Sequence, residues 1–89
     1  MPEEIITNEG EKIGEVSHFF GKISVAAIDL IGDLKVGDRV RIKGTTIDFE
    51  MEIDSMQIDR ETVSEAGSGQ SIGIKVGEKV RVGDEVYRL

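Results

Sequence analysis

Apolar residues alternate with polar ones in short segments along the chain, and glycines separate these segments. No window repeats its apolar residues every 3.6 positions, and only 61–65 is expected to form a single helical turn. Eleven glycines punctuate the sequence. Short alternating segments joined by glycine turns are typical of antiparallel sheets. The pattern therefore predicts an all-β chain with strands over 12–20, 23–30, 38–44, 49–58, 71–76 and 85–89.

The 89 residues are enough for one domain and leave no room for a second. Residues 1–11 are acidic and lack a clear period, so we expect a loose N-terminal arm followed by one β-domain over 12–89. Gly21 and Lys22 are expected to form a tight turn in which Gly21 has a positive φ. Gly37–Asp38 and Gly83–Asp84 repeat one turn pattern, with the aspartate expected to accept bonds from the following amides.

The segment from Arg39 to Asp54 predicts a hairpin with a defined register. If 45–48 form its loop, the three bases at 39, 41 and 43 lie opposite the three acids at 54, 52 and 50. The other face then pairs Val40 with Ile53 and Ile42 with Met51. Opposite charges on one face and apolar pairs on the other favour the same register.

Composition excludes several kinds of site. The chain has no cysteine, so it has no disulfide, no thiol nucleophile and no cysteine-bound metal. No nucleophile motif is present. The single histidine, His18, is expected to pack on a strand. The acids at 50, 52 and 54 are expected to pair with bases. We therefore predict no catalytic, cofactor or metal site. No apolar run approaches the roughly 20 residues that cross a bilayer, and a soluble cytoplasmic protein is expected.

The charge balance bears on partners. Eighteen acids and 11 bases give a net charge of −7, which disfavours long-range attraction to nucleic acid. The bases at 39, 41 and 43 are neutralised by the acids opposite. Lys75, Lys79 and Arg81 have only Glu78 among them, and together with Lys22 they are the candidate residues for binding RNA or a protein partner. Stacking of exposed bases needs aromatic side chains, and the phenylalanines are expected in the core.

Four ordered segments resemble domain two of the translational GTPases, the group that includes elongation factor Tu. They are Gly21–Lys22 after 15–16, the run 32–42, Ser55–Met56–Gln57 followed by Val63 and 65–67, and the run 69–74 closed by 81–86. The resemblance implies a six-stranded closed antiparallel β-barrel and a standalone, noncatalytic docking module with a protein or ribosomal partner.

The resemblance to domain two has limits. The chain has no Gly-x-x-x-x-Gly-Lys-Ser/Thr phosphate loop. Glu15 matches one acidic position of the family's transfer-RNA pocket, but Ser55 and Ile58 stand where the family has an acid and an arginine, so that pocket does not carry over. Two alternatives stay open: a weak RNA- or ribosome-binding factor, and an accessory domain like the C-terminal barrel of U32 peptidase-family proteins. The chain itself is not expected to be an enzyme, and its oligomeric state stays open.

Overall fold

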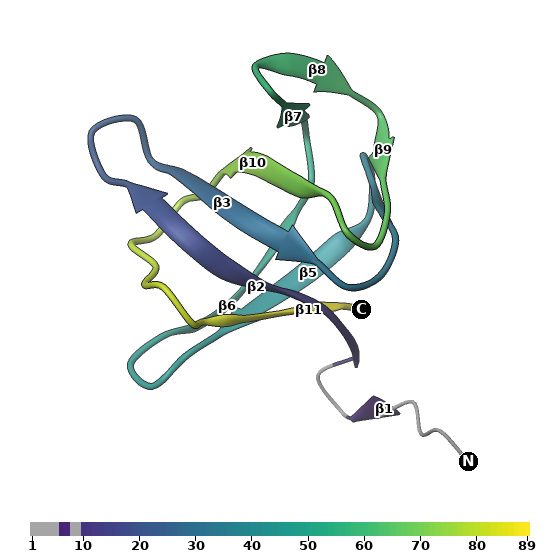
Figure 1. The fold of residues 1–89 in the computed structure, drawn as a ribbon. Coiled ribbons are helices and arrows are strands. Elements are labelled where there is room, and N and C mark those ends of the chain that lie inside the picture. The colour runs from purple at the N-terminus through teal and green to yellow at the C-terminus, as the bar shows by residue number, and fades with distance from the viewer. Residues whose placement is uncertain (1–5, 8–9) are drawn as a thin grey trace.

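A computed structural model describes residues 6–7 and 10–89, and this part of the chain is all-β, without a helix (Figure 1). Its strands are β1 Ile6–Thr7, β2 Gly10–Phe20, β3 Val25–Leu30, β4 Leu34–Lys35, β5 Arg39–Lys43, β6 Asp48–Glu52, β7 Met56–Ile58, β8 Glu61–Val63, β9 Glu65–Ala66, β10 Ser71–Lys75 and β11 Glu85–Arg88. Every paired ladder is antiparallel. The predicted fold class is therefore confirmed at this level.

The main sheet runs in the order β6-β5-β11-β2-β3-β10-β7-β8, and β1 pairs with the start of β2. Figure 1 shows this sheet curling round, so that β3 and β10 pass across β5 and β11. β4 and β9 form a separate two-stranded sheet. Within the described residues no ladder joins β6 to β8, so the hydrogen-bonded sheet has two ends.

The β2–β3 hairpin contains a β-bulge that the alternation could not reveal. Its register shifts between Val16 and His18, so Val16 and Phe19 both face the core although they are three residues apart. A bulge of this kind adds one residue to one strand and reverses the alternation beyond it. The predicted turn is present but spans 21–24, and the residue with positive φ is Ser24, at 56°, not Gly21. That detail of the prediction is wrong.

The predicted hairpin from 39 to 54 forms, but its register is wrong by two residues. Arg41 lies opposite Glu50 and Lys43 opposite Asp48, and the loop is 44–47, closed by a 2.8 Å bond from the Gly44 amide to the Ile47 carbonyl. A shift of two leaves every side chain on the same face, so the apolar pattern allows both registers. Charge pairing allows both as well.

Both predicted Gly-Asp turns form, with Gly37 at φ 99° and Gly83 at φ 95°. The aspartates accept bonds from preceding amides, not from following ones as expected. Asp38 Oδ2 lies 3.0 Å from the Lys35 amide, and Asp84 Oδ2 lies 2.8 Å from the Arg81 amide. Each carboxylate therefore closes its turn by accepting a hydrogen bond from the amide three residues earlier.

The predicted strand over 49–58 is divided into β6 and β7, and the expected helical turn over 61–65 is wrong. β8 occupies 61–63 and pairs with β7 across a two-residue turn. Asp59 and Arg60 in that turn have positive φ angles of 53° and 70°, the backbone that tight hairpins require. The sequence signal was weak because this turn contains no glycine.

The interior side chains come from both sheets and from the segment after β10. Sixteen apolar residues are buried in the described part of the chain, among them Ile13, Ile28, Leu34, Ile42 and Val86. Among the described residues Asp84 is the one buried charged residue, with 7% of its surface exposed. The predicted arm over 1–11 falls mostly outside the described residues; its residues 10 and 11 begin β2.

Candidate functional site

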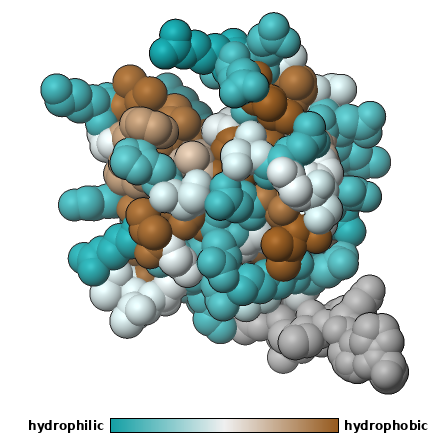
Figure 2. Space-filling model, viewed as in Figure 1, coloured by the Kyte–Doolittle hydropathy of each residue, from teal (hydrophilic) through white to brown (hydrophobic). Residues whose placement is uncertain are grey.

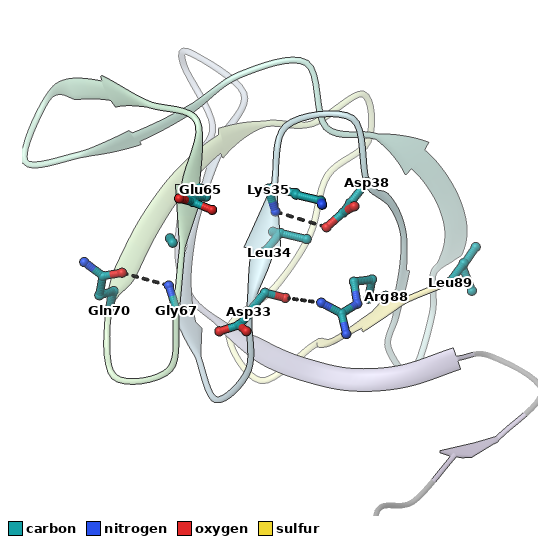
Figure 3. Close-up of a pocket in the computed structure, with 10 residues that line it drawn as sticks. Asp33, Leu34, Lys35, Asp38, Glu65, Gly67, Gln70, Arg88 and Leu89 are labelled. Carbon is teal, nitrogen blue, oxygen red and sulfur yellow. Dashed lines mark hydrogen bonds between the residues drawn. The ribbon is translucent and has the colours of Figure 1, made fainter.

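A hollow lies where the small β4–β9 sheet meets the end of β11. Its volume is about 680 Å³, and its lining residues are Asp33, Leu34, Lys35, Asp38, Glu65, Ala66, Gly67, Gln70, Arg88 and Leu89. These residues come from the β3–β4 turn, β4, the turn before β5, β9, the β9–β10 turn and the chain end (Figure 3). We call this hollow the end pocket.

Leu34 and Ala66 form the apolar floor of the end pocket. They pair directly across the small sheet, and 1% and 9% of their surfaces are exposed. Burial of these two side chains in the common core fixes the position of both strands. The residues beside them on the ladder, Lys35 and Glu65, are exposed and stand opposite each other. The floor is therefore rigid, and the rim is charged.

Hydrogen bonds hold the loops around the end pocket. The Gly67 amide donates to Gln70 Oε1 at 2.8 Å, which closes the β9–β10 turn. The Arg88 guanidinium donates to the Asp33 carbonyl at 2.8 Å and to Glu11 Oε1 at 2.9 Å. Arg88 therefore connects the start of β2, the β3–β4 turn and the end of β11.

Two carboxylates on the rim are available to a ligand. The side chains of Asp33 and Glu65 are exposed and make no hydrogen bond or ion pair with another described residue. Figure 3 shows them on the β9 side of the pocket, whereas the Lys35 side chain extends toward Asp38. The Lys35 ammonium likewise has no partner among the described side chains. Such a mixed rim can form ion pairs with a polypeptide that carries both signs of charge.

A charged network on β2 and β11 lies next to this region. Lys12 Nζ donates to Glu15 Oε2 at 3.0 Å and to Glu85 Oε2 at 3.3 Å. The hydrogen bond to Glu15 is the main reason that the pKa of Lys12 is raised above its ordinary value. The pKa of Glu85 is lowered, chiefly because the Tyr87 hydroxyl donates to it at 2.7 Å. Lys12 and Glu85 therefore stay charged at neutral pH and hold β11 against β2.

The candidate residues from the sequence lie elsewhere. Lys22 is in the β2–β3 turn, and Lys79 lines a smaller hollow of about 350 Å³ together with Gly21 and Ser24 of that turn. Lys75 pairs with Val25 at the same end of the sheet. Arg81 lies further along, in the turn before β11. The structure thus brings Lys22, Lys75 and Lys79 to one end, and whether they bind a partner stays a prediction.

The residues of the end pocket carry no functional signal in the sequence. Segments 32–42 and 65–67 stand out there only as parts of a family resemblance. β4 and β9 have two residues each, too few to show alternation. In the described ranges no three metal-ligating side chains lie together, and these ranges contain no helix long and apolar enough to cross a membrane.

Comparisons with known proteins point to proteases. No family model matches the chain. It is 46% identical over 79 residues to an uncharacterized protease of Methanocaldococcus jannaschii, a match that covers 88% of this chain and 19% of the relative. It is 32% identical over 85 residues to a collagenase of Porphyromonas gingivalis, covering 93% of this chain and 24% of that one. The chain thus spans about a fifth of the length of the curated relatives it matches.

Two solved structures with the same fold are of a C-terminal domain. The C-terminal domain of a U32 peptidase described as putative, from Geobacillus thermoleovorans, matches with a TM-score of 0.82 at 18% identity, covering 86% of this chain and 90% of that one. Its selenomethionine variant matches with a TM-score of 0.83 at 19% identity, covering 86% and 98%.

These findings decide between the family interpretations made from sequence. The resemblance to domain two of elongation factors is wrong, because the relatives are a protease and collagenases and the matching structures are domains of a U32 peptidase. The alternative, an accessory domain like the C-terminal barrel of U32 proteins, is confirmed at the level of fold. The expectation that the chain is not an enzyme is contradicted by its relatives, which are named as a protease and collagenases. The cytoplasmic location stays a prediction.

Proposed function

We propose that this chain acts as the accessory β-domain of a U32-type protease and contacts the rest of the protease through the end pocket. One observation carries the proposal. The structural match covers most of this chain and 98% of a separately solved C-terminal domain. The sequence matches cover most of this chain but only about a fifth of the curated proteases. A unit that has been solved as a separate C-terminal domain and that matches only part of longer proteases is suited to work beside the remainder of such a protease.

The end pocket is the best-suited contact surface for that role. It combines the apolar floor of Leu34 and Ala66 with unpaired charges on Asp33, Glu65 and Lys35. Interfaces between domains of one chain are typically more polar than obligate protein interfaces. A basic side chain of the protease would meet Asp33 and Glu65, while an apolar one would lie over the floor.

Isothermal titration calorimetry tests the proposal. The chain is titrated into the M. jannaschii protease from which the matched 79 residues have been deleted. We expect saturable binding at one to one, weakened about tenfold or more in the double variant Asp33→Asn, Glu65→Gln, because two interfacial charges are lost. Glu61→Gln, an exposed acid on β8, is the matched control and should bind as the unaltered chain does. The proposal would be contradicted if the unaltered chain did not bind, or if the double variant Asp33→Asn, Glu65→Gln bound as tightly as the control Glu61→Gln.

We also propose that the curled sheet behaves as a six-stranded closed barrel, the architecture that the resemblance to domain two implied. Main-chain bonds from Val36 to Ser64 and from Gly37 to Ile53, 2.9 Å and 2.8 Å long, bridge the two ends of the sheet. If these bonds close the barrel, the Val36 and Gly37 amides should exchange hydrogen as slowly as the amide of Ile28 on β3. Fast exchange at both positions would indicate an open sheet.

A further inference from the structure

A second charged surface lies at the opposite end of the molecule from the end pocket. β2 begins beside the pocket, where Glu11 pairs with Arg88, and ends at Phe20 next to the β2–β3 turn. Phe20 lies nine positions after Glu11 along the strand, which corresponds to roughly 30 Å of strand length. The two surfaces are therefore independent, and a role for the second goes beyond contact with the protease.

Three cations without acidic partners gather at this end. Lys22, Lys75 and Lys79 are exposed, and none forms an ion pair with a described residue. The Val76 amide donates to the Ser24 carbonyl at 2.9 Å, which holds the segment after Lys75 against the turn that carries Lys22. In a chain with a net charge of −7, such a local group acts at short range, because salt screens charges beyond about 8 Å.

Large apolar side chains are exposed beside these cations. Phe20 is 45% exposed and Ile23 60%, although the phenylalanines were expected in the core. The ring of Phe20 lies against His18, with 4.4 Å between ring centroids. In Figure 2 hydrophobic and hydrophilic side chains lie side by side over the left of the molecule, where Figure 1 places this turn. Exposed aromatic and aliphatic side chains in such a setting are typical of contact surfaces.

A hollow between the β2–β3 turn and the loop after β10 makes this surface concave. Its volume is about 350 Å³, and Phe19, Gly21, Ser24, Gly77, Glu78 and Lys79 line it. Phe19 packs against the core and forms its apolar wall. Lys79 is on the lining of this hollow, and Lys22 is in the turn that supplies Gly21 and Ser24 to it. A concave site with an apolar wall and these cations fits one apolar side chain flanked by carboxylates. A flat lipid surface would leave this hollow unfilled.

We infer that this end of the molecule, which we call the basic tip, binds an acidic polypeptide segment that inserts one apolar side chain into the hollow. The lysines 22, 75 and 79 form ion pairs with carboxylates on either side of that apolar residue. Phe20 and Ile23, exposed at the turn outside the hollow, contact neighbouring residues of the same segment. Glu78, the one acid among the lining residues of the hollow, disfavours an all-carboxylate ligand and favours an apolar residue at the centre.

Fluorescence anisotropy with a defined probe tests this inference. The probe is a dye-labelled decapeptide of eight glutamates around a central Leu-Phe pair, and its counterpart carries lysines in place of the glutamates. We expect binding of the acidic peptide that weakens with added salt, and about tenfold weaker binding by the double variant Lys22→Glu, Lys79→Glu. Ile23→Ser should weaken binding roughly fivefold through lost apolar contact. Arg60→Glu, a single charge reversal in the distant β7–β8 turn, is the control and should leave the affinity unchanged.

The outcomes separate this inference from its rivals and from the proposed function. Equal binding of the lysine peptide, or full affinity in the Lys22→Glu, Lys79→Glu variant, would overturn it. So would tighter binding of single-stranded oligouridylate or of phosphatidylserine vesicles with displacement of the peptide, since the surface would then serve nucleic acid or lipid. Circular dichroism verifies that each variant is folded. The end-pocket variant Asp33→Asn, Glu65→Gln should bind the peptide normally, so failure of one proposal leaves the other testable.

Discussion

The two Gly-Asp turns contain equivalent hydrogen bonds from a backbone amide to an aspartate. The aspartate is buried in one turn and partly exposed in the other. Asp84 is 7% exposed, and its Oδ2 accepts from the Arg81 amide at 2.8 Å. Asp38 is half-buried and accepts from the Lys35 amide at 3.0 Å. Because water can replace the lost carboxylate only at the exposed turn, removal of the two carboxylates should have different effects.

The magnitudes follow from burial. A hydrogen bond to a charged acceptor contributes about 1.5–3 kcal/mol, and a buried donor left without a partner incurs its full desolvation cost. Asp84→Ala should therefore lower the free energy of unfolding by about 2 kcal/mol, a large share of the about 5 kcal/mol expected of a small domain. Asp38→Ala should cost roughly 0.5–1 kcal/mol. In a domain of this size, 2 kcal/mol corresponds to a fall in Tm of about 8–16 °C.

Thermal and urea unfolding, followed by circular dichroism, measure both losses. The variant Asp84→Asn keeps an oxygen acceptor in nearly the same volume, so it should recover part of the stability that Asp84→Ala loses. A loss below about 0.5 kcal/mol for Asp84→Ala, well under the range for a charged acceptor, would show that this bond does not stabilise the turn. Equal losses at the two turns would show that burial does not decide the cost.

Three further substitutions probe the hairpin 39–52 and the core. A side chain at Gly44 would collide with the Asp84 carboxylate, so Gly44→Ala should destabilise the domain by about 1–3 kcal/mol, measured by urea unfolding. Arg41 donates to Asp48 Oδ1 at 2.6 Å and lowers the pKa of that carboxyl below its ordinary 3.8; in Arg41→Gln, carbon-detected NMR should find this pKa raised. The contact stabilises the folded state above the ordinary pKa, and its contribution disappears as the pH falls through the lowered value. Ile28 is fully buried, so Ile28→Ala should cost about 3 kcal/mol, and a loss under 1 kcal/mol would show that the core there is loose.

The fold class was predictable because alternation and glycine turns report directly on antiparallel strands. All six predicted strand regions contain a strand of the structure, and both Gly-Asp turns form with positive φ at the glycine. The register of the hairpin was not predictable, since Arg41 finds an acid whether it lies opposite Glu52 or Glu50. The two registers differ in the loop that joins the strands. In the structure the Gly44 amide donates to the Ile47 carbonyl at 2.8 Å, a bond that alternation does not predict.

The end pocket was beyond sequence reasoning for a different reason. Its rim is assembled from segments far apart in the chain, such as Asp33, Glu65 and Arg88, and two of its strands have two residues each. The exposure of Phe20 was missed because the bulge at 16–18 changes which face the end of β2 presents. Ordered turn motifs report on the shape of a small β-domain, and one shape serves unrelated proteins. That is why the turns led to a translation-factor family.

Contact with the protease through the end pocket can be read residue by residue from an NMR chemical-shift map. The ¹⁵N-labelled chain is mixed with the M. jannaschii protease that lacks the matched segment. We predict that the amides of Leu34, Lys35, Ala66 and Gly67 shift on binding, while those of the basic tip stay unchanged. Unchanged spectra at saturating protease, or shifts confined to the basic tip, would contradict the assignment of the end pocket as the surface that contacts the protease.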